Sequence, residues 1–225
     1  MTNAVRRLLI TKEDIMKKTL LFIFGFWFSL PFCCSLQAQA DVTEPEALAV
    51  VKTFVDEGIK FLKSLPKNKE ISKANVDSFH NLLRKYLDFK AIAIDLVGHG
   101  IWNKMDAAKQ MEYVDAFENM IVYDYVRRFQ EYSDQKVLVN TARIKPSRAG
   151  VRADVLCALT SDFDSKPTAL VWEVHRAEDG NIKVTDLTVA GISMAITMKA
   201  EFKQIRRQHG GMEGLIKYLR TKAKK

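Results

Sequence analysis

Apolar residues recur at helical spacing from residue 46 to residue 97. Over residues 46–65 they fall three or four positions apart, and Pro66 follows as a stop. The hydroxyl of Ser72 suits the N-cap of a second helix, which continues to about residue 86. A short third helix is expected over residues 89–97, because Gly98 interrupts the pattern. These patterns predict three consecutive helices.

The fourth predicted helix is the longest. Asp106 suits its N-cap, and apolar side chains then recur at helical spacing over residues 111–129. Tyr113, Met120 and Tyr123 add part of a second apolar stripe. An apolar surface this wide indicates that the helix contacts neighbours on more than one side.

At Lys136 the period changes from helical to strand-like. The alternation that follows and the Asp179–Gly180 hairpin signal predict a four-stranded antiparallel meander. Two further helices follow, separated by glycines 210 and 211. Helices, then a sheet, then helices make an α+β fold. The predicted strands cover residues 137–144, 151–160, 169–177 and 181–189, and the last helices cover 194–208 and about 212–219.

The predicted sheet and the long helix carry more large apolar side chains than one buried face requires. A tightly filled core explains this pattern, and so does a cavity between helices and sheet that receives an apolar ligand. Cys157 belongs to the same question. It lies in the middle of the second strand, and its thiol either packs in the core or lines the cavity.

The first 40 residues resemble a secretory signal. Residues 16–18 form a short basic start, residues 20–32 are almost wholly apolar, and Ala38-Gln39-Ala40 fits signal-peptidase cleavage after Ala40. We therefore expect Met16 to be the true start, residues 1–15 to lie upstream of it, and residues 41–225 to form one domain. An uncleaved anchor helix is the alternative, although the apolar run is shorter than the roughly 20 residues of a comfortable span.

Charge and cysteine content narrow the possible partners. The net charge of the whole chain is +8, and removal of residues 1–40 takes away five basic and two acidic residues, which leaves +5. That moderate charge suits anionic lipid surfaces or an acidic protein but gives no argument for nucleic acid. Cys33 and Cys34 leave with the signal, so Cys157 has no cysteine partner within the mature chain.

Motifs for catalysis, metal binding or cofactor binding are missing from the sequence. It contains no H-E-x-x-H zinc motif, G-x-S-x-G elbow, phosphate-binding loop or dinucleotide glycine fingerprint, and its four histidines are scattered. We therefore predict no catalytic residue, no metal and no cofactor. One enzymatic alternative stays open, in which Asp154 or Asp186 performs acid/base chemistry on a small apolar substrate.

Two segments carry a resemblance to a known family. The first is residues 79–93, beginning Phe79-His-Asn-Leu-Leu-Arg, and the second is Val184-Thr-Asp-Leu-Thr-Val-Ala-Gly-Ile-Ser193, followed by Glu201-Phe202 and a glycine-Leu-Ile ending at 214–216. Both are similar to the MlaC family, also called toluene-tolerance auxiliary proteins of a lipid ABC transporter. The similarity spans residues 47–222. Ala190 departs from the family, which usually has glutamate there.

The resemblance implies a periplasmic carrier that moves phospholipid between the inner and outer membranes and maintains outer-membrane asymmetry. It also implies two partners, an inner-membrane ABC transporter with its substrate-binding subunit and an outer-membrane lipoprotein complex. A hopanoid or other lipid remains an alternative cargo, and an adaptor that binds only proteins remains an alternative function. The side chains expected to bind lipid are Phe89, Leu96, Trp102, Phe117, Ile121, Tyr125, Phe129, Val155, Cys157, Leu170, Trp172, Val174 and Ile192.

Overall fold

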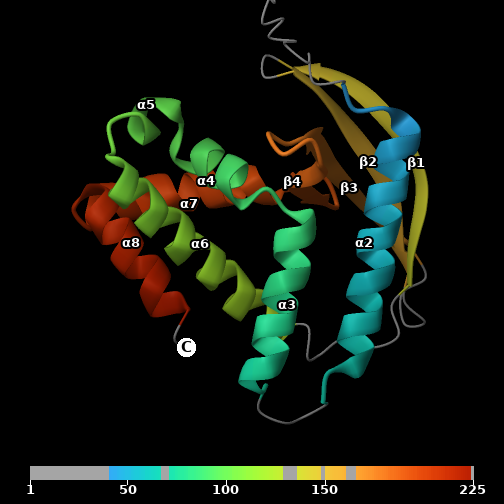
Figure 1. Cartoon of the computed structure of the whole chain (residues 1–225), viewed down its shortest axis with the longest axis horizontal. Coiled ribbons are helices and arrows are strands. Elements are labelled where there is room, and N and C mark those ends of the chain that lie inside the picture. Colours follow the sequence, from blue (N-terminus) through green and yellow to red (C-terminus); the bar gives the residue numbers. More distant parts are fainter. Residues whose placement is uncertain (1–40, 67–70, 129–135, 148–149, 161–165, 224–225) are drawn as a thin grey trace, which may run out of the picture. The chain divides into compact units, whose positions relative to one another are not determined.

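The computed structural model describes residues 41–66, 71–128, 136–147, 150–160 and 166–223 (Figure 1). The proposed signal segment and Phe129 lie outside these residues. Within the described part, helices precede and follow an antiparallel sheet, as the α+β prediction required.

Side-chain caps fix the starts of the first helices. Helix α2 (Glu44–Ser64) begins with a capping box, in which the Thr43 N–H donates to Glu46 Oε2 at 3.0 Å. Ser72 caps α3 (Lys73–Tyr86) by accepting from the Asn75 N–H at 3.2 Å. Asp88 caps α4 (Phe89–Val97) by accepting from the Ala91 N–H at 2.9 Å. The Ser72 cap predicted from the sequence is therefore confirmed.

Gly98 does more than end a helix. It adopts φ = +84° after α4, and a four-residue helix, α5 (His99–Trp102), begins at the next residue. The sequence pattern predicted only an exit at this point, because a single turn is too short to show a period. The long helix α6 (Ala107–Arg128) then starts at the predicted cap, where the Lys109 N–H donates to Asp106 Oδ1 at 2.7 Å.

The sheet has five strands in sequential order, whereas the sequence predicted four. The first four are β1 (Lys136–Ser147), β2 (Gly150–Thr160), β3 (Thr168–Arg176) and β4 (Ile182–Val189). The fifth, β5 (Ile192–Ser193), has two residues and pairs with the end of β4. Ala190 and Gly191 connect them, both with positive φ as in two-residue hairpin loops. A two-residue strand has no alternation to detect, so the sequence did not reveal it.

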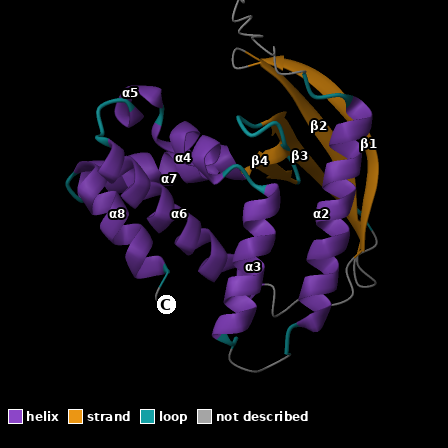
Figure 2. Ribbon diagram, in the orientation of Figure 1, coloured by secondary structure: helices purple, strands orange, loops and turns teal. Residues whose placement is uncertain are grey.

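Two regions of the fold contribute to one apolar core. Helix α2 packs against β1 and β2, where the small side chains Ala142 and Ala153 are buried beneath it. The last helices, α7 (Met194–Gln208) and α8 (Gly211–Lys222), pack with α4 and α6 beside the sheet (Figures 1 and 2). Their shared core includes Phe117 and Phe202, whose rings meet edge to face at 6.1 Å.

The segment between α3 and α4 joins the helices to the sheet. Leu87 forms an isolated parallel bridge with Val184 of β4, and the Asp88 N–H donates to the Val184 carbonyl at 3.0 Å. Asp88 also pairs with His175 of β3, with 2.8 Å between Oδ2 and Nε2. These contacts fix α4 relative to the strands and determine where the space between helices and sheet lies.

Candidate functional site

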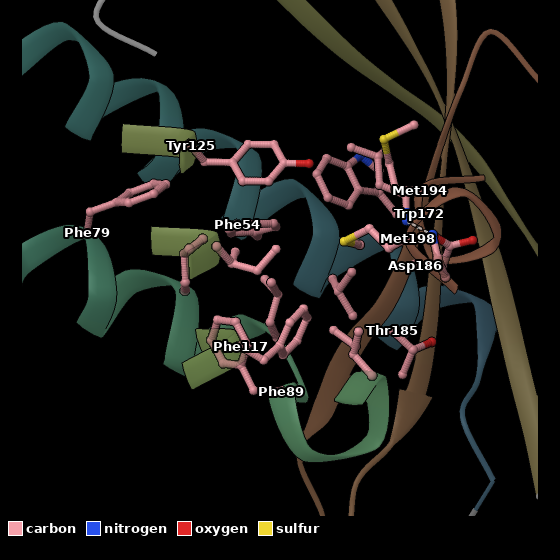
Figure 3. Close-up of a pocket in the computed structure, with 17 residues that line it drawn as sticks. Phe54, Phe79, Phe89, Phe117, Tyr125, Trp172, Thr185, Asp186, Met194 and Met198 are labelled. Atoms are coloured by element: carbon pink, nitrogen blue, oxygen red, sulfur yellow. Dashed lines mark hydrogen bonds between the residues drawn. The ribbon is translucent and has the colours of Figure 1, made fainter. Parts of the chain in front are cut away.

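An apolar cavity of about 130 Å³ lies between the sheet and the surrounding helices. Seven elements contribute to its wall: α2, α3, α4 and α6 before the sheet, β3 and β4 within it, and α7 after it (Figure 3). The lining residues are Phe54, Phe79, Leu83, Leu87, Phe89, Ile92, Phe117, Ile121, Tyr125, Trp172, Val184, Thr185, Asp186, Leu187, Met194, Ala195 and Met198.

Amphipathic helices explain why so many apolar side chains meet there. Helix α6 directs Phe117, Ile121 and Tyr125 to the cavity at four-residue intervals, as residues on one face of a helix must. On α7, Met194 and Met198 line the cavity, and Phe202 continues the same stripe into the core. Burial raises the pKa of the Tyr125 hydroxyl above its usual range, so this group stays neutral in the wall.

Asp186 and Thr185 are the polar residues on the β4 side of the lining. Asp186 Oδ2 accepts from the Ser193 hydroxyl at 2.5 Å, and its Oδ1 accepts from the N–H groups of Leu187 and Ala195 at 2.8 and 2.9 Å. Ser193 in turn accepts from the Ile196 N–H at 3.0 Å and caps α7. We call the hydrogen-bonded pair Asp186 and Ser193 the α7 latch, because it closes the β4–β5 hairpin and starts the helix.

Thr185 is also engaged within the sheet. Its hydroxyl donates to Glu173 Oε1 at 3.1 Å. Burial alone would raise the pKa of Glu173, but its ion pairs with Arg152 and Lys145 lower that pKa below the usual range. Neither β4 residue therefore presents an unengaged acid or base to the cavity.

Of the thirteen residues predicted to bind lipid, the structure describes twelve, and five of them line the cavity. These are Phe89, Phe117, Ile121, Tyr125 and Trp172. Phe129 lies outside the described residues. The other seven lie elsewhere: Leu96, Val155, Cys157, Leu170 and Val174 are buried in the core, Trp102 is half-buried in α5, and Ile192 is 61% exposed on β5.

Other lining residues were not singled out from the sequence. They come from α2, α3 and α7, for example Phe54, Phe79 and Met198. Each lies on the apolar stripe of an amphipathic helix. Such a stripe shows which face of the helix is buried, but it does not show which residues of that face line a cavity. Contacts between distant segments supply this information: the Phe54 ring meets the Trp172 ring edge to face, with centroids 5.4 Å apart and 77° between planes.

Cys157 lies in the core rather than in the cavity lining. Its side chain is 4% exposed, beneath the helices on the covered face of the sheet. Burial raises the pKa of the thiol to about 11. The structure therefore places the thiol in the packed core, and lipid binding by Cys157 stays a prediction.

Charged clusters outside the cavity connect elements of the fold. Glu118 of α6 is buried and pairs with Arg84 and His80 of α3. Burial alone would raise the pKa of Asp88, but its hydrogen bonds with His175 and the Ala91 N–H lower it. These ion pairs link α3 to α6 and the start of α4 to β3. Their carboxylates and histidines are therefore engaged with one another rather than directed at a ligand.

Among the described residues, no cluster of three or more histidine, cysteine or acidic side chains is arranged to hold a metal. Asp154 lies outside the cavity lining and pairs with Lys145 at 3.8 Å. In the same part of the chain, no helix combines the length and the apolar character needed to cross a membrane.

The fold and site together define an α+β domain with an apolar cavity between its sheet and helices. The chain belongs to the MlaC family, whose profile, described as MlaC protein, matches residues 52–221. A solved structure of a phospholipid-binding protein from Ralstonia solanacearum in complex with a phospholipid has the same fold, with a TM-score of 0.63 and 21% identity over 80% of this chain and 97% of that one. No curated protein matches the sequence.

Proposed function

We propose that this protein is a periplasmic carrier that holds the acyl chains of a phospholipid in the cavity. The cavity lining carries the proposal. Of its seventeen residues, Thr185 and Asp186 are polar and already hydrogen-bonded, and the others are aliphatic, aromatic or sulfur-containing. Pockets with such walls suit apolar ligands, which they remove from water.

The comparisons support the same cargo. Membership of the MlaC family supports a role in lipid transport, and the structurally similar Ralstonia protein is described as phospholipid-binding and holds a phospholipid. A diacyl lipid has about 30 methylene groups, and transfer of each to water costs about 0.8 kcal/mol, or about 24 kcal/mol in all. A carrier with an apolar interior removes most of this cost without any catalytic group.

The cavity volume implies that lipid binding changes the conformation. A cavity of about 130 Å³ is comparable with an engineered cavity of about 150 Å³ that holds one benzene molecule. Two acyl chains need several times that space, so the walls must separate to admit them. Met194 and Met198 are suited to this movement because methionine side chains are flexible and adapt to irregular surfaces.

The remaining parts of the proposal concern location and partners. We propose export with signal cleavage after Ala40, because Ala38-Gln39-Ala40 follows an apolar run and the family is periplasmic. Lipid would pass between an inner-membrane ABC transporter with its substrate-binding subunit and an outer-membrane lipoprotein complex. This transport would maintain the lipid asymmetry of the outer membrane. The mature net charge of +5 favours contact with acidic partners or anionic lipid surfaces.

A binding function accounts for the site better than the enzymatic alternative. Asp186 was the candidate acid or base, but its carboxylate accepts hydrogen bonds from the Ser193 hydroxyl and from the N–H groups of Leu187 and Ala195. Asp186 thus serves as an acceptor that holds the start of α7, whereas binding of acyl chains needs only the apolar wall. Asp154, the other candidate, lies outside the cavity lining.

Native mass spectrometry of protein purified from the periplasm tests the proposal. We expect about one phospholipid per chain, identified in an organic extract. Ile121→Trp, which fills the cavity from α6, should lose the lipid, whereas Met111→Trp on the same helix should keep it because Met111 is 63% exposed.

The possible outcomes separate the alternatives. Identical masses before and after delipidation would contradict the carrier proposal and favour a protein-binding adaptor. A hopanoid in the extract would keep the carrier but change its cargo. Lipid retention by Ile121→Trp would show that the cargo lies outside this cavity.

A further inference from the structure

The indole of Trp172 brings a hydrogen-bond donor to the apolar cavity without a partner for it. Trp172 lies on β3 and its ring lines the cavity, packed edge to face against Phe54 (Figure 3). Its Nε1 atom is buried and has no hydrogen-bond partner. Buried polar groups in native proteins are almost always paired, so an unpaired donor at a binding site needs an explanation.

The polar side chains of β4 in the lining already have hydrogen-bond partners within the protein. Thr185 and Asp186 are hydrogen-bonded within the protein. Two other side chains among the described residues also have a buried unpaired atom, Tyr86 and Arg206, but neither lines the cavity. Within the described lining, Trp172 is therefore the residue that has a buried side-chain donor without a hydrogen-bond partner.

We propose that the Trp172 N–H donates a hydrogen bond to an ester carbonyl oxygen of the bound diacyl lipid. This inference rests on the phospholipid-carrier function proposed above. Ester carbonyls lie at the polar ends of the acyl chains, accept hydrogen bonds and lose water when the chains are buried. Indole is a donor only, so it matches an acceptor and has nothing to offer a second donor.

The charge of the site favours the ester over the phosphate. Asp186 lies on the same side of the cavity as Trp172 (Figure 3), and its carboxylate opposes entry of a second anion. A neutral carbonyl carries no such penalty. The phosphate would then stay outside the cavity, and Trp172 would recognise the linkage between head group and chains.

Matched lipids that differ only in this linkage test the inference. We would measure the affinities of wild type and Trp172→Phe for a diester and a diether phosphatidylglycerol of equal chain length. Wild type should bind the diester about fivefold more tightly, the effect of one ordinary hydrogen bond. Trp172→Phe, which keeps an aromatic wall without the donor, should bind both lipids equally.

Phe54→Leu is the matched control. It removes the ring that packs on Trp172 but leaves the donor, so it should weaken both lipids alike and keep the fivefold ratio. Equal binding of the two lipids by wild type would overturn the inference, even if Trp172→Phe failed to fold. Retention of the ratio in Trp172→Phe would overturn it as well. Failure of wild type to bind either lipid would overturn the carrier function itself.

Discussion

Single residues in this protein show how burial decides between two chemical roles. Cys157 is a free thiol, which could be reactive, but it occupies the position of a core residue. Its thiol packs on the covered face of the sheet, where burial raises its pKa to about 11. Because thiolate is the nucleophile, a rise from the ordinary value of 9 lowers the reactive fraction at neutral pH about a hundredfold.

We therefore expect Cys157 to react slowly with N-ethylmaleimide in folded protein, at the same rate with and without phospholipid. The rate should rise with pH toward 11, because the folded thiol loses its proton only there. Labelling in urea provides the control, since an exposed thiol should react at least a hundredfold faster at pH 7. Rapid labelling of delipidated protein that phospholipid blocks would instead place the thiol at the lipid site.

Ala190 illustrates backbone strain at a single position. It has φ = +50°, a left-handed conformation that costs an L-residue about 1 kcal/mol. Asparagine tolerates this region and is preferred in two-residue hairpins. Ala190→Asn should therefore raise the free energy of unfolding by about 0.5 to 1 kcal/mol in urea titrations.

The same substitution in a helix provides the comparison. Ala200 is exposed within α7, where asparagine has lower helix propensity than alanine, so Ala200→Asn should lower stability by about 0.5 kcal/mol. Opposite signs at the two positions would attribute the gain at Ala190 to its backbone conformation. A loss of stability at Ala190 would contradict the strain argument.

Helices and strands were predictable from the sequence where they are long enough to show a period. The predicted bounds of α7, residues 194–208, agree with the structure, and the caps at Ser72 and Asp106 are confirmed. The strand β5 and helix α5 were missed because two and four residues carry no periodic signal. The cavity wall was predictable on α6, where three large residues share one face, but not on α2 or α3, whose contribution depends on tertiary packing.

The α7 latch acts at the scale of whole elements, since the Ser193 hydroxyl makes one hydrogen bond that closes a hairpin and a second that starts a helix. Ser193→Ala removes the bond to Asp186 and the cap on the Ile196 N–H. Loss of a serine cap costs about 1 kcal/mol, and the second bond should raise the total to about 2 kcal/mol. Urea unfolding would measure this loss.

Ser72→Ala is the matched control for the latch. Ser72 caps α3 through the Asn75 N–H, and among the described residues it has no second side-chain partner like Asp186, so its loss should cost about 1 kcal/mol. Ser193→Ala should also reduce phospholipid retention, because the latch positions Met194 and Met198 in the cavity wall. Equal stability losses in the two variants, with lipid retained by both, would show that Ser193 acts only as a helix cap.

At the scale of the whole molecule, the cavity lies at the junction between a sheet region and a helical region. It is not enclosed within either region alone. Helix α2 lies on the sheet, α4, α6, α7 and α8 pack together, and the Leu87–Val184 bridge connects the two regions. A small separation of regions that meet along a cavity enlarges it without unfolding either region. This arrangement would let a cavity of about 130 Å³ admit the proposed lipid, which is several times larger.

A ligand that fills this junction should stabilise the whole fold. A ligand that binds only the folded state at a hundredfold excess over its Kd adds about 2.7 kcal/mol. For a domain of this size, each kcal/mol corresponds to about 2 to 4 °C, so reloading delipidated protein with phospholipid should raise Tm by about 5 to 10 °C. Differential scanning calorimetry would measure the shift, and Met111→Trp should show it as wild type does. Ile121→Trp should show none, because its indole occupies the space that the acyl chains need. A shift that persists in Ile121→Trp would mean that lipid stabilises the protein from its surface, and the junction would then have no role in binding.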